Sequence, residues 1–218
     1  LLAVGVGCER GVAAEEVIAL VRSTLGDAGF AESAVLGLYS LDLKGDEAAI
    51  HALAETLGVP ARFFPAPVLE AETPRLANPS AQVFAEVGCH GVAEAAALAA
   101  AGSDSILVVA KRKSARATVA VAEAPLPFDG AAAGRPRGSL HVVGIGPGGA
   151  DWLTPEAAQL IAAADDLVGY RLYLDLLGPL GRDQRRHDFA LGEEVARVRA
   201  ALALAAEGRN VALISSGD

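Results

Sequence analysis

The alternation of apolar and polar positions in the first 123 residues predicts strands and helices in turn. Leu2–Val6 is an apolar run of strand length, and later stretches carry apolar residues at helical spacing. The pattern predicts strands at 2–6, 35–40, 63–64, 106–110 and 118–122, and helices at 13–25, 46–57 and 92–101. We expect Asp46 to cap the second helix and the last two strands to form a hairpin. Pro65–Pro79 holds four prolines and is expected to be a loop.

A second series of elements begins near residue 139. Strands are predicted at 140–145, 167–170 and 211–214, and helices at 155–164, 171–178 and 192–207. Between the two series, residues 124–138 are rich in Pro, Gly, Ala and Arg, which is typical of a linker. The predicted fold class is therefore α/β, with two lobes of mainly parallel sheet over 1–123 and 139–218, joined by this Pro/Gly/Ala-rich linker.

Composition narrows the range of functions. The 218 residues carry a net charge of −9, and the mean hydropathy is +0.37. An acidic chain disfavours a nucleic-acid partner, and no apolar run reaches the roughly 18 residues of a membrane span. Two cysteines indicate a reducing compartment, so we expect a cytoplasmic protein. Because the chain contains no Met and stops just after an apolar strand, we expect it to be an excerpt of a longer polypeptide.

The most informative stretch is Leu140–Leu153, where an apolar strand enters a glycine-rich loop around Pro147. A loop of this kind exposes backbone N–H groups to an anionic ligand. Thr154 and Pro155 follow and predict the start of a helix, with Thr154 as its cap. A tight turn without a ligand is the simpler alternative.

The same loop also satisfies the dinucleotide fingerprint G-x-G-x-x-G, at Gly144, Gly146 and Gly149. A Rossmann-type NAD oxidoreductase is therefore a further alternative. In that fold the third glycine opens the helix, so that the helix dipole meets the pyrophosphate. Here Asp151, Trp152 and Leu153 still lie between the glycines and Thr154, and this disfavours such a site.

Three blocks in order carry a family resemblance: GIGPGGADWLTPEA, ADDLVGYRLYLDLL and residues 212–218. They resemble the tetrapyrrole methylases over residues 139–218. Within them the Gly-Tyr-x-x-Tyr element at 169–173 most resembles precorrin-3B C(17)-methyltransferase. The resemblance implies two lobes around a cleft that binds S-adenosyl-L-methionine and a tetrapyrrole, and a homodimer formed through the complete methylase domain. Because the chain holds only the first lobe, we expect it to be inactive alone.

The resemblance to the methylases also implies roles for single residues. Tyr170 falls where related methylases place a polar catalytic group, and a phenol there exchanges a proton. Packing of Tyr170 against Tyr173 is the alternative. The residues expected at the cleft are Pro147, Gly217 and Asp218 for the cofactor, Gly146 and Gly148 for the substrate, and Tyr170 for catalysis.

A basic cluster precedes Phe189 and is expected to lie in a loop. It contains Arg182, Arg185, Arg186 and His187. Arginine binds carboxylates in a bidentate manner. We therefore expect Arg182, Arg186 and His187 to bind the carboxylates of a tetrapyrrole, with a solvated loop as the alternative.

Four segments of the first lobe carry a second resemblance: Gly5–Gly11, Leu38–Glu47, Asn78–Leu98 and Val108–Ala122. They resemble the C-terminal domain of the cobalt-precorrin 5A hydrolase family, which also occurs alone as a small protein. From the charges, the strand ends and this resemblance, we expect substrate contacts from Arg10, Ser40, Lys44, Glu47 and Lys111. Helix caps and solvated surface charges are the alternatives.

Two cysteines and an acid of the first lobe have simple interpretations. Cys8 is expected to be a packed thiol rather than a nucleophile, because no base is visible beside it. The spacing of Cys8, Cys89 and His90 is not that of a metal site. Glu94 is expected to interact with the dipole of its own helix.

Together the two resemblances imply a fused protein of cobalamin biosynthesis. The implied reaction is S-adenosylmethionine-dependent methylation of precorrin-3B, or its cobalt analogue, at C-17 with ring contraction. A non-catalytic tetrapyrrole-binding or carrier module is the alternative of a different class, chiefly for the first lobe.

Overall fold

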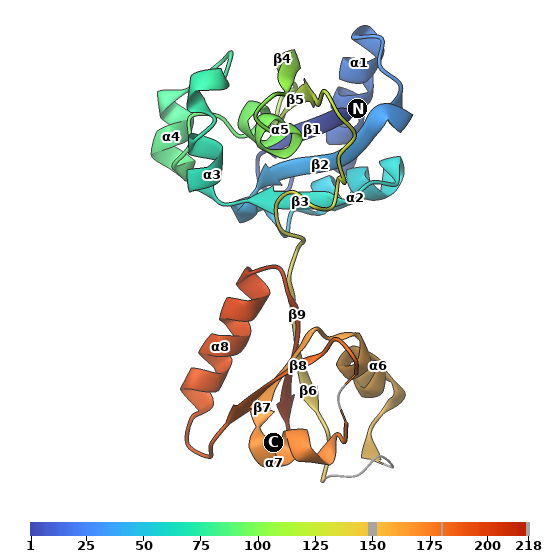
Figure 1. The fold of residues 1–218 in the computed structure, drawn as a ribbon, viewed down its shortest axis with the longest axis vertical. Helices are drawn as coiled ribbons and strands as arrows, with labels where there is room; N and C mark the ends of the chain where they lie inside the picture. Colours follow the sequence, from blue (N-terminus) through green and yellow to red (C-terminus); the bar gives the residue numbers. More distant parts are fainter. Residues whose placement is uncertain (148–151, 180, 217–218) are drawn as a thin grey trace. The chain divides into compact units, whose positions relative to one another are not determined.

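The chain divides into two compact units, Leu1–Arg137 and Gly138–Asp218 (Figure 1). The computed structural model describes residues 1–147, 152–179 and 181–216. Each unit has its own sheet with helices packed on both faces, so the predicted α/β class is confirmed. In the described ranges, no helix combines the length and the apolar character needed to cross a membrane.

The first unit is built on a five-stranded sheet in the order β3-β2-β1-β5-β4. Its strands are β1 (Leu2–Cys8), β2 (Val35–Leu41), β3 (Ala61–Phe64), β4 (Ile106–Lys113) and β5 (Ala117–Glu123). β1, β2 and β3 are parallel, whereas β5 is antiparallel to both β1 and β4. The predicted hairpin is confirmed, and its pairing with β1 makes the sheet mixed.

Helices cover both faces of this sheet. On one face, α1 (Ala14–Asp27) and α2 (Ala48–Leu57) bury the apolar stripes that the sequence predicts. On the other face lie α3 (Ala66–Glu70) and α5 (Ala93–Ala101), with α4 (Ala81–Val87) beside them (Figure 1). α5 consists almost entirely of alanine because it packs directly on β1. A Cβ atom on Gly5 would overlap the backbone carbonyl of Ala93, so this contact requires glycine.

Two predictions in this unit are wrong. Asp46 does not cap α2: Glu47 occupies the cap position, and the Asp46 carboxylate pairs with Arg10 instead. Pro65–Pro79 is not a continuous loop, because it contains α3 and a 3-10 turn. Pro67 lies in the first turn of α3, where a missing N–H costs no helical hydrogen bond. A proline at this position is compatible with the start of a helix.

Residues 124–137 make up most of the predicted linker, and in the structure they are attached to the first unit. The hydroxyl of Tyr39 donates a 2.9 Å hydrogen bond to the carbonyl of Gly130. Arg135 exchanges two backbone hydrogen bonds of 2.8 Å with Phe63 on the open edge of β3. We refer to this segment as the strap.

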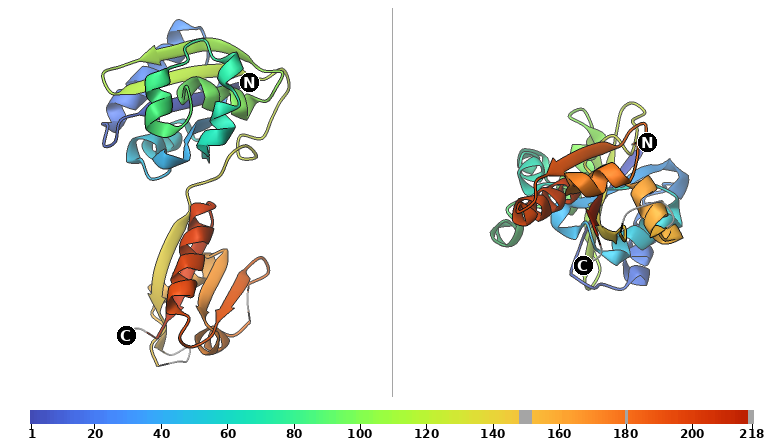
Figure 2. Two further views of the ribbon diagram at one scale, coloured as in Figure 1. Left: turned by 90° about the vertical axis from the view of Figure 1, so that its left-hand side faces the viewer. Right: turned by 90° about the horizontal axis from the view of Figure 1, so that it is seen from below.

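The described residues of the second unit form a parallel sheet in the order β6-β9-β7-β8. Its strands are β6 (Ser139–Gly144), β7 (Asp166–Tyr170), β8 (Arg185–Phe189) and β9 (Asn210–Ser215). α6 (Pro155–Ala163) and α7 (Arg171–Leu176) pack on one face, and α8 (Glu194–Ala206) lies along the other (Figure 2). The loop predicted around Arg185–His187 is wrong, since these residues begin β8.

The predicted start of α6 is confirmed, and its cap can be tested. The side-chain oxygen of Thr154 accepts a 3.2 Å hydrogen bond from the N–H of Ala157. Thr154→Ala is expected to lower the free energy of unfolding of the second unit by about 1 kcal/mol, because this N–H loses its acceptor. Urea unfolding would measure the change, with Thr154→Ser as the control. Equal midpoints for the two variants would contradict a stabilising cap.

Candidate functional site

A cavity of about 460 Å³ opens at the edge of the first sheet where β1 and β2 end. Its walls come from Cys8 at the end of β1, Lys44 after β2, α4, the N-terminal turn of α5, and the turn between β4 and β5. Loops converge at the carboxyl ends of parallel strands, and ligands of α/β proteins gather there. We therefore treat this cavity as the candidate site of the first unit.

A buried carboxylate, Glu94, connects three walls of the cavity. Its side chain lies in the first turn of α5 and the residue is only 2% exposed. One carboxylate oxygen accepts hydrogen bonds of 2.8 Å from the backbone N–H of Lys111 and from the side-chain amide of Asn78. The other accepts the backbone N–H of Asn78 at 2.9 Å. Glu94 therefore joins α5 to β4 and to the segment before α4.

The ionisation of Glu94 follows from these contacts. Burial acts to raise the pKa of the Glu94 carboxyl, but the hydrogen bonds from Lys111 and Asn78 stabilise its charged form. The net effect holds this pKa below its ordinary value. Glu94 is thus an ionised group that fixes the shape of the cavity, and it is not poised to donate a proton at neutral pH.

Three lysines line the cavity and differ in what they contact. The ammonium group of Lys111 donates a 3.1 Å hydrogen bond to the carbonyl of Asn78. The ammonium groups of Lys44 and Lys113 make no hydrogen bond or ion pair with the described residues. Two cations of the cavity are therefore available to an anionic ligand.

Cys8 lies in the cavity wall as a partly buried thiol. Burial raises the pKa of Cys8, and the nearby Lys44 ammonium offsets this only in part. A thiol with a raised pKa is neutral at physiological pH and is a poor nucleophile. In ranges 1–147, 152–179 and 181–216, no group of three or more His, Cys, Asp or Glu side chains could hold a metal ion.

In the second unit, the ends of β6 and β9 lie side by side. Gly144 faces Ser215 in the parallel register, and the N–H of Ile145 donates a 2.9 Å hydrogen bond to the Ser215 carbonyl. The turn at Gly146 and Pro147 therefore starts beside the end of β9. Three of the predicted contacts lie outside the described residues: Gly148, Gly217 and Asp218.

Tyr170 ends β7 and borders a wide depression of about 590 Å³. Its ring packs edge-on against Tyr173, with 5.3 Å between the ring centroids. The depression is also lined by Leu172 and Leu191, which are 54% and 77% exposed. The second unit thus presents a tyrosine and apolar side chains at the carboxyl edge of its sheet.

Comparison with known proteins identifies both units. A family model described as "Cobalamin synthesis G C-terminus" matches residues 2–122, which is more than half of the chain. The chain belongs to this family. A second model, described as "Tetrapyrrole (Corrin/Porphyrin) Methylases", matches residues 139–218. The chain therefore joins a domain of cobalamin synthesis to part of a tetrapyrrole methylase, and both predicted resemblances are confirmed.

Individual relatives agree with this division. Protein CobE of Sinorhizobium sp. is 54% identical over 121 residues, which cover 56% of this chain and 79% of that protein. The crystal structure of CobE at 1.7 Å resolution superimposes with a TM-score of 0.53 and 44% identity, covering 56% of this chain and 89% of that one. Precorrin-3B C(17)-methyltransferase of Sinorhizobium sp. is 47% identical over 81 residues, or 37% of this chain. The chain spans only 32% of that enzyme's length.

The match to the methylases decides between the alternatives for the glycine-rich loop. The fingerprint at Gly144, Gly146 and Gly149 also allowed a Rossmann-type NAD oxidoreductase. Because residues 139–218 match the methylases as a block, this alternative is not supported. A G-x-G-x-x-G spacing alone carries little specificity.

In the cobalamin synthesis G domain, the predicted contact Arg10 and the nearby Arg116 are both held by internal partners. Arg10 pairs with Asp46 and donates to the carbonyl of Leu43. Arg116 pairs with Glu9 at 2.9 Å. Lys44 and Lys111 do line the cavity. The sequence reveals cations readily, but it does not reveal which of them fold against a carboxylate.

Two further predicted contacts, Ser40 and Glu47, are buried. The Ser40 hydroxyl is fully buried and donates a 2.7 Å hydrogen bond to the carbonyl of Val6. Glu47 is 5% exposed and accepts the backbone N–H of Gly11. In the structure these side chains act between segments of the first unit: Ser40 joins β2 to β1, and Glu47 holds the loop after β1.

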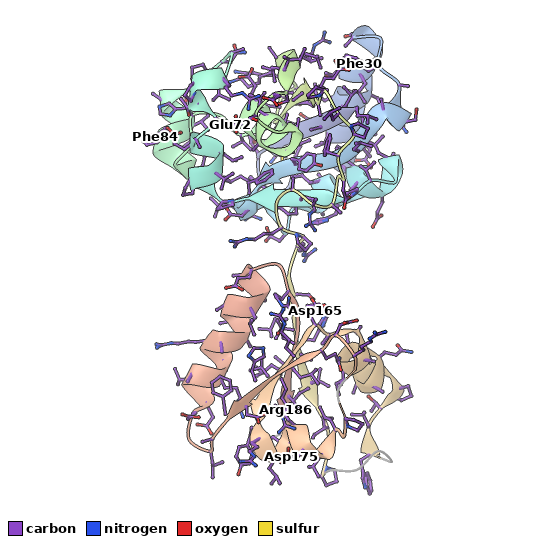
Figure 3. The ribbon with its side chains drawn as sticks, viewed as in Figure 1. Phe30, Glu72, Phe84, Asp165, Asp175 and Arg186 are labelled. Atoms are coloured by element: carbon purple, nitrogen blue, oxygen red, sulfur yellow. The ribbon has the colours of Figure 1, made fainter. Side chains whose placement is uncertain are left out.

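In the methylase part, the residues of the predicted basic cluster differ in exposure and in their partners. Arg182 is exposed, whereas Arg186 pairs with Asp175 and Asp188 (Figure 3). His187 contacts the buried carboxylate of Asp166, with 2.8 Å between Nε2 and the oxygen. Arg186 and His187, two of the three predicted substrate contacts, are thus engaged within the unit, and Arg182 is exposed.

Lys113 lines the cavity but is not among the contacts expected from the sequence. Lys113 faces Thr118 across the hairpin, and both line the cavity, whereas the neighbouring Arg112 pairs with Asp27 of α1 on the other face. Side chains alternate between the faces of a strand. This alternation is the sequence signal that distinguishes Lys113, which lines the cavity, from Arg112, which pairs with α1 on the other face.

Proposed function

We propose that this chain is part of a longer protein of cobalamin biosynthesis. That protein transfers a methyl group from S-adenosyl-L-methionine to C-17 of precorrin-3B, or of its cobalt analogue, with ring contraction. Its first unit binds a polycarboxylated tetrapyrrole of the same pathway. The observation that carries the proposal is the succession, in one chain, of a cobalamin synthesis G domain and a tetrapyrrole methylase segment.

The geometry of the second unit fits a cofactor held between two loops. The strands β6 and β9 end side by side, because Gly144 and Ser215 are paired in register. S-adenosyl-L-methionine supplies an activated methyl group on a sulfonium, so the protein has mainly to position the two reactants. Pro147 bounds one side of that position, and Gly217 with Asp218 is expected to bound the other.

Tyr170 is the candidate for proton exchange with the substrate. It stands at the end of β7, beside the depression lined by Leu172 and Leu191. These apolar side chains provide a surface for a flat macrocycle, and the phenol lies at its margin. The remaining lobe of the methylase would complete the cleft and the expected homodimer, which is why we expect this chain alone to be inactive.

Cofactor choice is tested by thermal unfolding of the full-length protein. S-adenosylhomocysteine at about 100 times its dissociation constant is expected to stabilise the methylase by about 2.7 kcal/mol, whereas NAD at equal concentration should have no effect. The reason is that only a ligand that binds the native state shifts the transition. Stabilisation by NAD without stabilisation by S-adenosylhomocysteine would overturn the methyltransferase proposal.

A further inference from the structure

The charge lining the first-unit cavity differs in sign from the charge of the chain. Four cationic side chains line it, Lys44, Lys111, Lys113 and Arg116, against three acidic ones, Glu9, Glu86 and Glu94. The local balance is +1, whereas the whole chain carries −9. An anionic ligand is therefore attracted to this cavity more than to the average surface of the protein.

Two of these cations already have partners within the first unit. Arg116 pairs with Glu9, and Lys111 donates to the carbonyl of Asn78. In the part of the chain that the structure describes, Lys44 and Lys113 have no such partner. Lys44 lines the cavity together with Cys8, and its positive charge offsets in part the rise that burial causes in the pKa of the thiol.

These two lysines stand at opposite ends of the cavity. Lys44 follows β2, and Lys113 ends β4. In the sheet order, β1 and β5 lie between these strands. Three steps of about 4.8 Å place the two strand ends roughly 14 Å apart. A ligand that contacts both ammonium groups without drawing the lysines together must carry anionic groups at some distance from each other.

The part of the cavity between the two lysines has room for one edge of a larger molecule. Leu41, Val83 and Val87 contribute apolar surface, while α5 directs its first turn into the cavity. A volume of about 460 Å³ lies in the lower half of the range of about 300–1,000 Å³ seen for ligand sites. The cavity therefore accommodates one edge of a macrocycle, with the rest of the ring outside.

We propose that this cavity is a two-point carboxylate receptor in which Lys44 and Lys113 bind two separated carboxylates on one edge of a tetrapyrrole. The inference rests on the proposed function for the identity of the macrocycle, and on the two unpaired lysines for the mode of binding. Glu94 acts as a positioning residue, because it fixes the backbone of Lys111 next to the end of β4.

Binding of uroporphyrin III, a macrocycle with eight carboxylates, to the 218-residue chain tests the proposal. The change in visible absorbance of the porphyrin gives the dissociation constant. Lys44→Ala and Lys113→Ala are each expected to weaken binding about tenfold, because each removes one charge-assisted hydrogen bond. Citrate, whose carboxylates lie close together, is expected to compete only weakly.

Arg112→Ala is the matched control for Lys113→Ala. The two residues are adjacent and carry the same charge, but Arg112 pairs with Asp27 away from the cavity. We expect Arg112→Ala to change binding less than about twofold, since long-range charge effects are screened by salt. Equal effects of the two substitutions would overturn the proposal, because only general electrostatics would then remain.

Two other outcomes would also overturn the two-point receptor. One is wild-type protein that does not bind uroporphyrin III, and the other is citrate that competes at the affinity of the porphyrin. Neither outcome bears on the methyltransferase proposal, which stands or falls with stabilisation by S-adenosylhomocysteine. Conversely, a protein that binds the porphyrin through both lysines but ignores S-adenosylhomocysteine would keep the receptor and lose the methyltransferase.

Discussion

Replacing Glu94 with Ala is expected to lower the free energy of unfolding of the first unit by about 3 kcal/mol, or about 10 °C in its unfolding midpoint. The substitution removes the acceptor of three hydrogen bonds from Asn78 and Lys111. It also leaves a void at a position that is 2% exposed. Differential scanning calorimetry measures the shift. The second unit has its own core, so its transition serves as an internal reference.

Glu86→Ala is the control variant, because it removes a negative charge from the same cavity. Glu86 lines the same cavity from the exposed face of α4 and accepts one hydrogen bond of 3.2 Å from Gln82. Its removal is expected to cost less than about 0.5 kcal/mol. If Glu94→Ala were as mild as Glu86→Ala, Glu94 would not be the group that holds the cavity walls together.

The stabilisation by Glu94 should also depend on pH. Because the folded state holds the pKa of Glu94 below its unfolded value, its contribution is complete above the unfolded pKa of about 4.3. It is lost as the pH falls through the lower pKa of the folded state. The difference between wild type and Glu94→Ala is therefore expected to be constant near neutral pH and to shrink in acid.

Replacing Asp166 with Ala is expected to destabilise the second unit to a similar extent, by about 3 kcal/mol. Asp166 is fully buried at the start of β7 and contacts both His187 of β8 and Arg209 before β9. Burial acts to raise the pKa of Asp166, but these partners hold it below its ordinary value. Without the carboxylate, the Arg209 guanidinium loses its ion pair. The side-chain interactions that connect β7 to β8 and to the start of β9 are then lost.

The midpoint of the second calorimetric transition measures this effect. Asp183→Ala is the control, because Asp183 is exposed and its side chain makes no hydrogen bond or ion pair with the described residues. The expected pattern is a lower second transition for Asp166→Ala alone, with the first transition unchanged. A lowered first transition instead would show that Asp166 does not act within its own unit.

Local signals in the sequence predicted local structure well. Thr154 and Pro155 predict the start of α6 because a cap depends only on its own turn. Asp46 failed as a cap because its partner, Arg10, is 36 residues away in the sequence. β8 was missed because its sequence, Arg185–Phe189, is dominated by charged and polar residues, as befits a strand at the edge of a sheet.

In the candidate site, too, the sequence did not reveal interactions between distant segments. Lys44 and Lys111 were predicted from charge and strand ends, and both line the cavity. Glu94 was interpreted as a helix-dipole residue, because nothing in the sequence places Asn78 and Lys111 beside it. A side chain's role depends on partners from distant segments, and a single sequence does not contain those pairings in readable form.

The strap covers part of one open edge of the first unit's sheet. β3 lies at the edge of its sheet, and Phe63 exchanges both of its outward backbone hydrogen bonds with Arg135. A polypeptide cut after residue 123 would leave the outer edge of that strand unpaired and remove the acceptor of the Tyr39 hydroxyl. Unpaired strand edges recruit other strands. The boundary of homology at residue 122 would therefore yield a protein that self-associates, whereas a boundary at residue 137 keeps the edge closed.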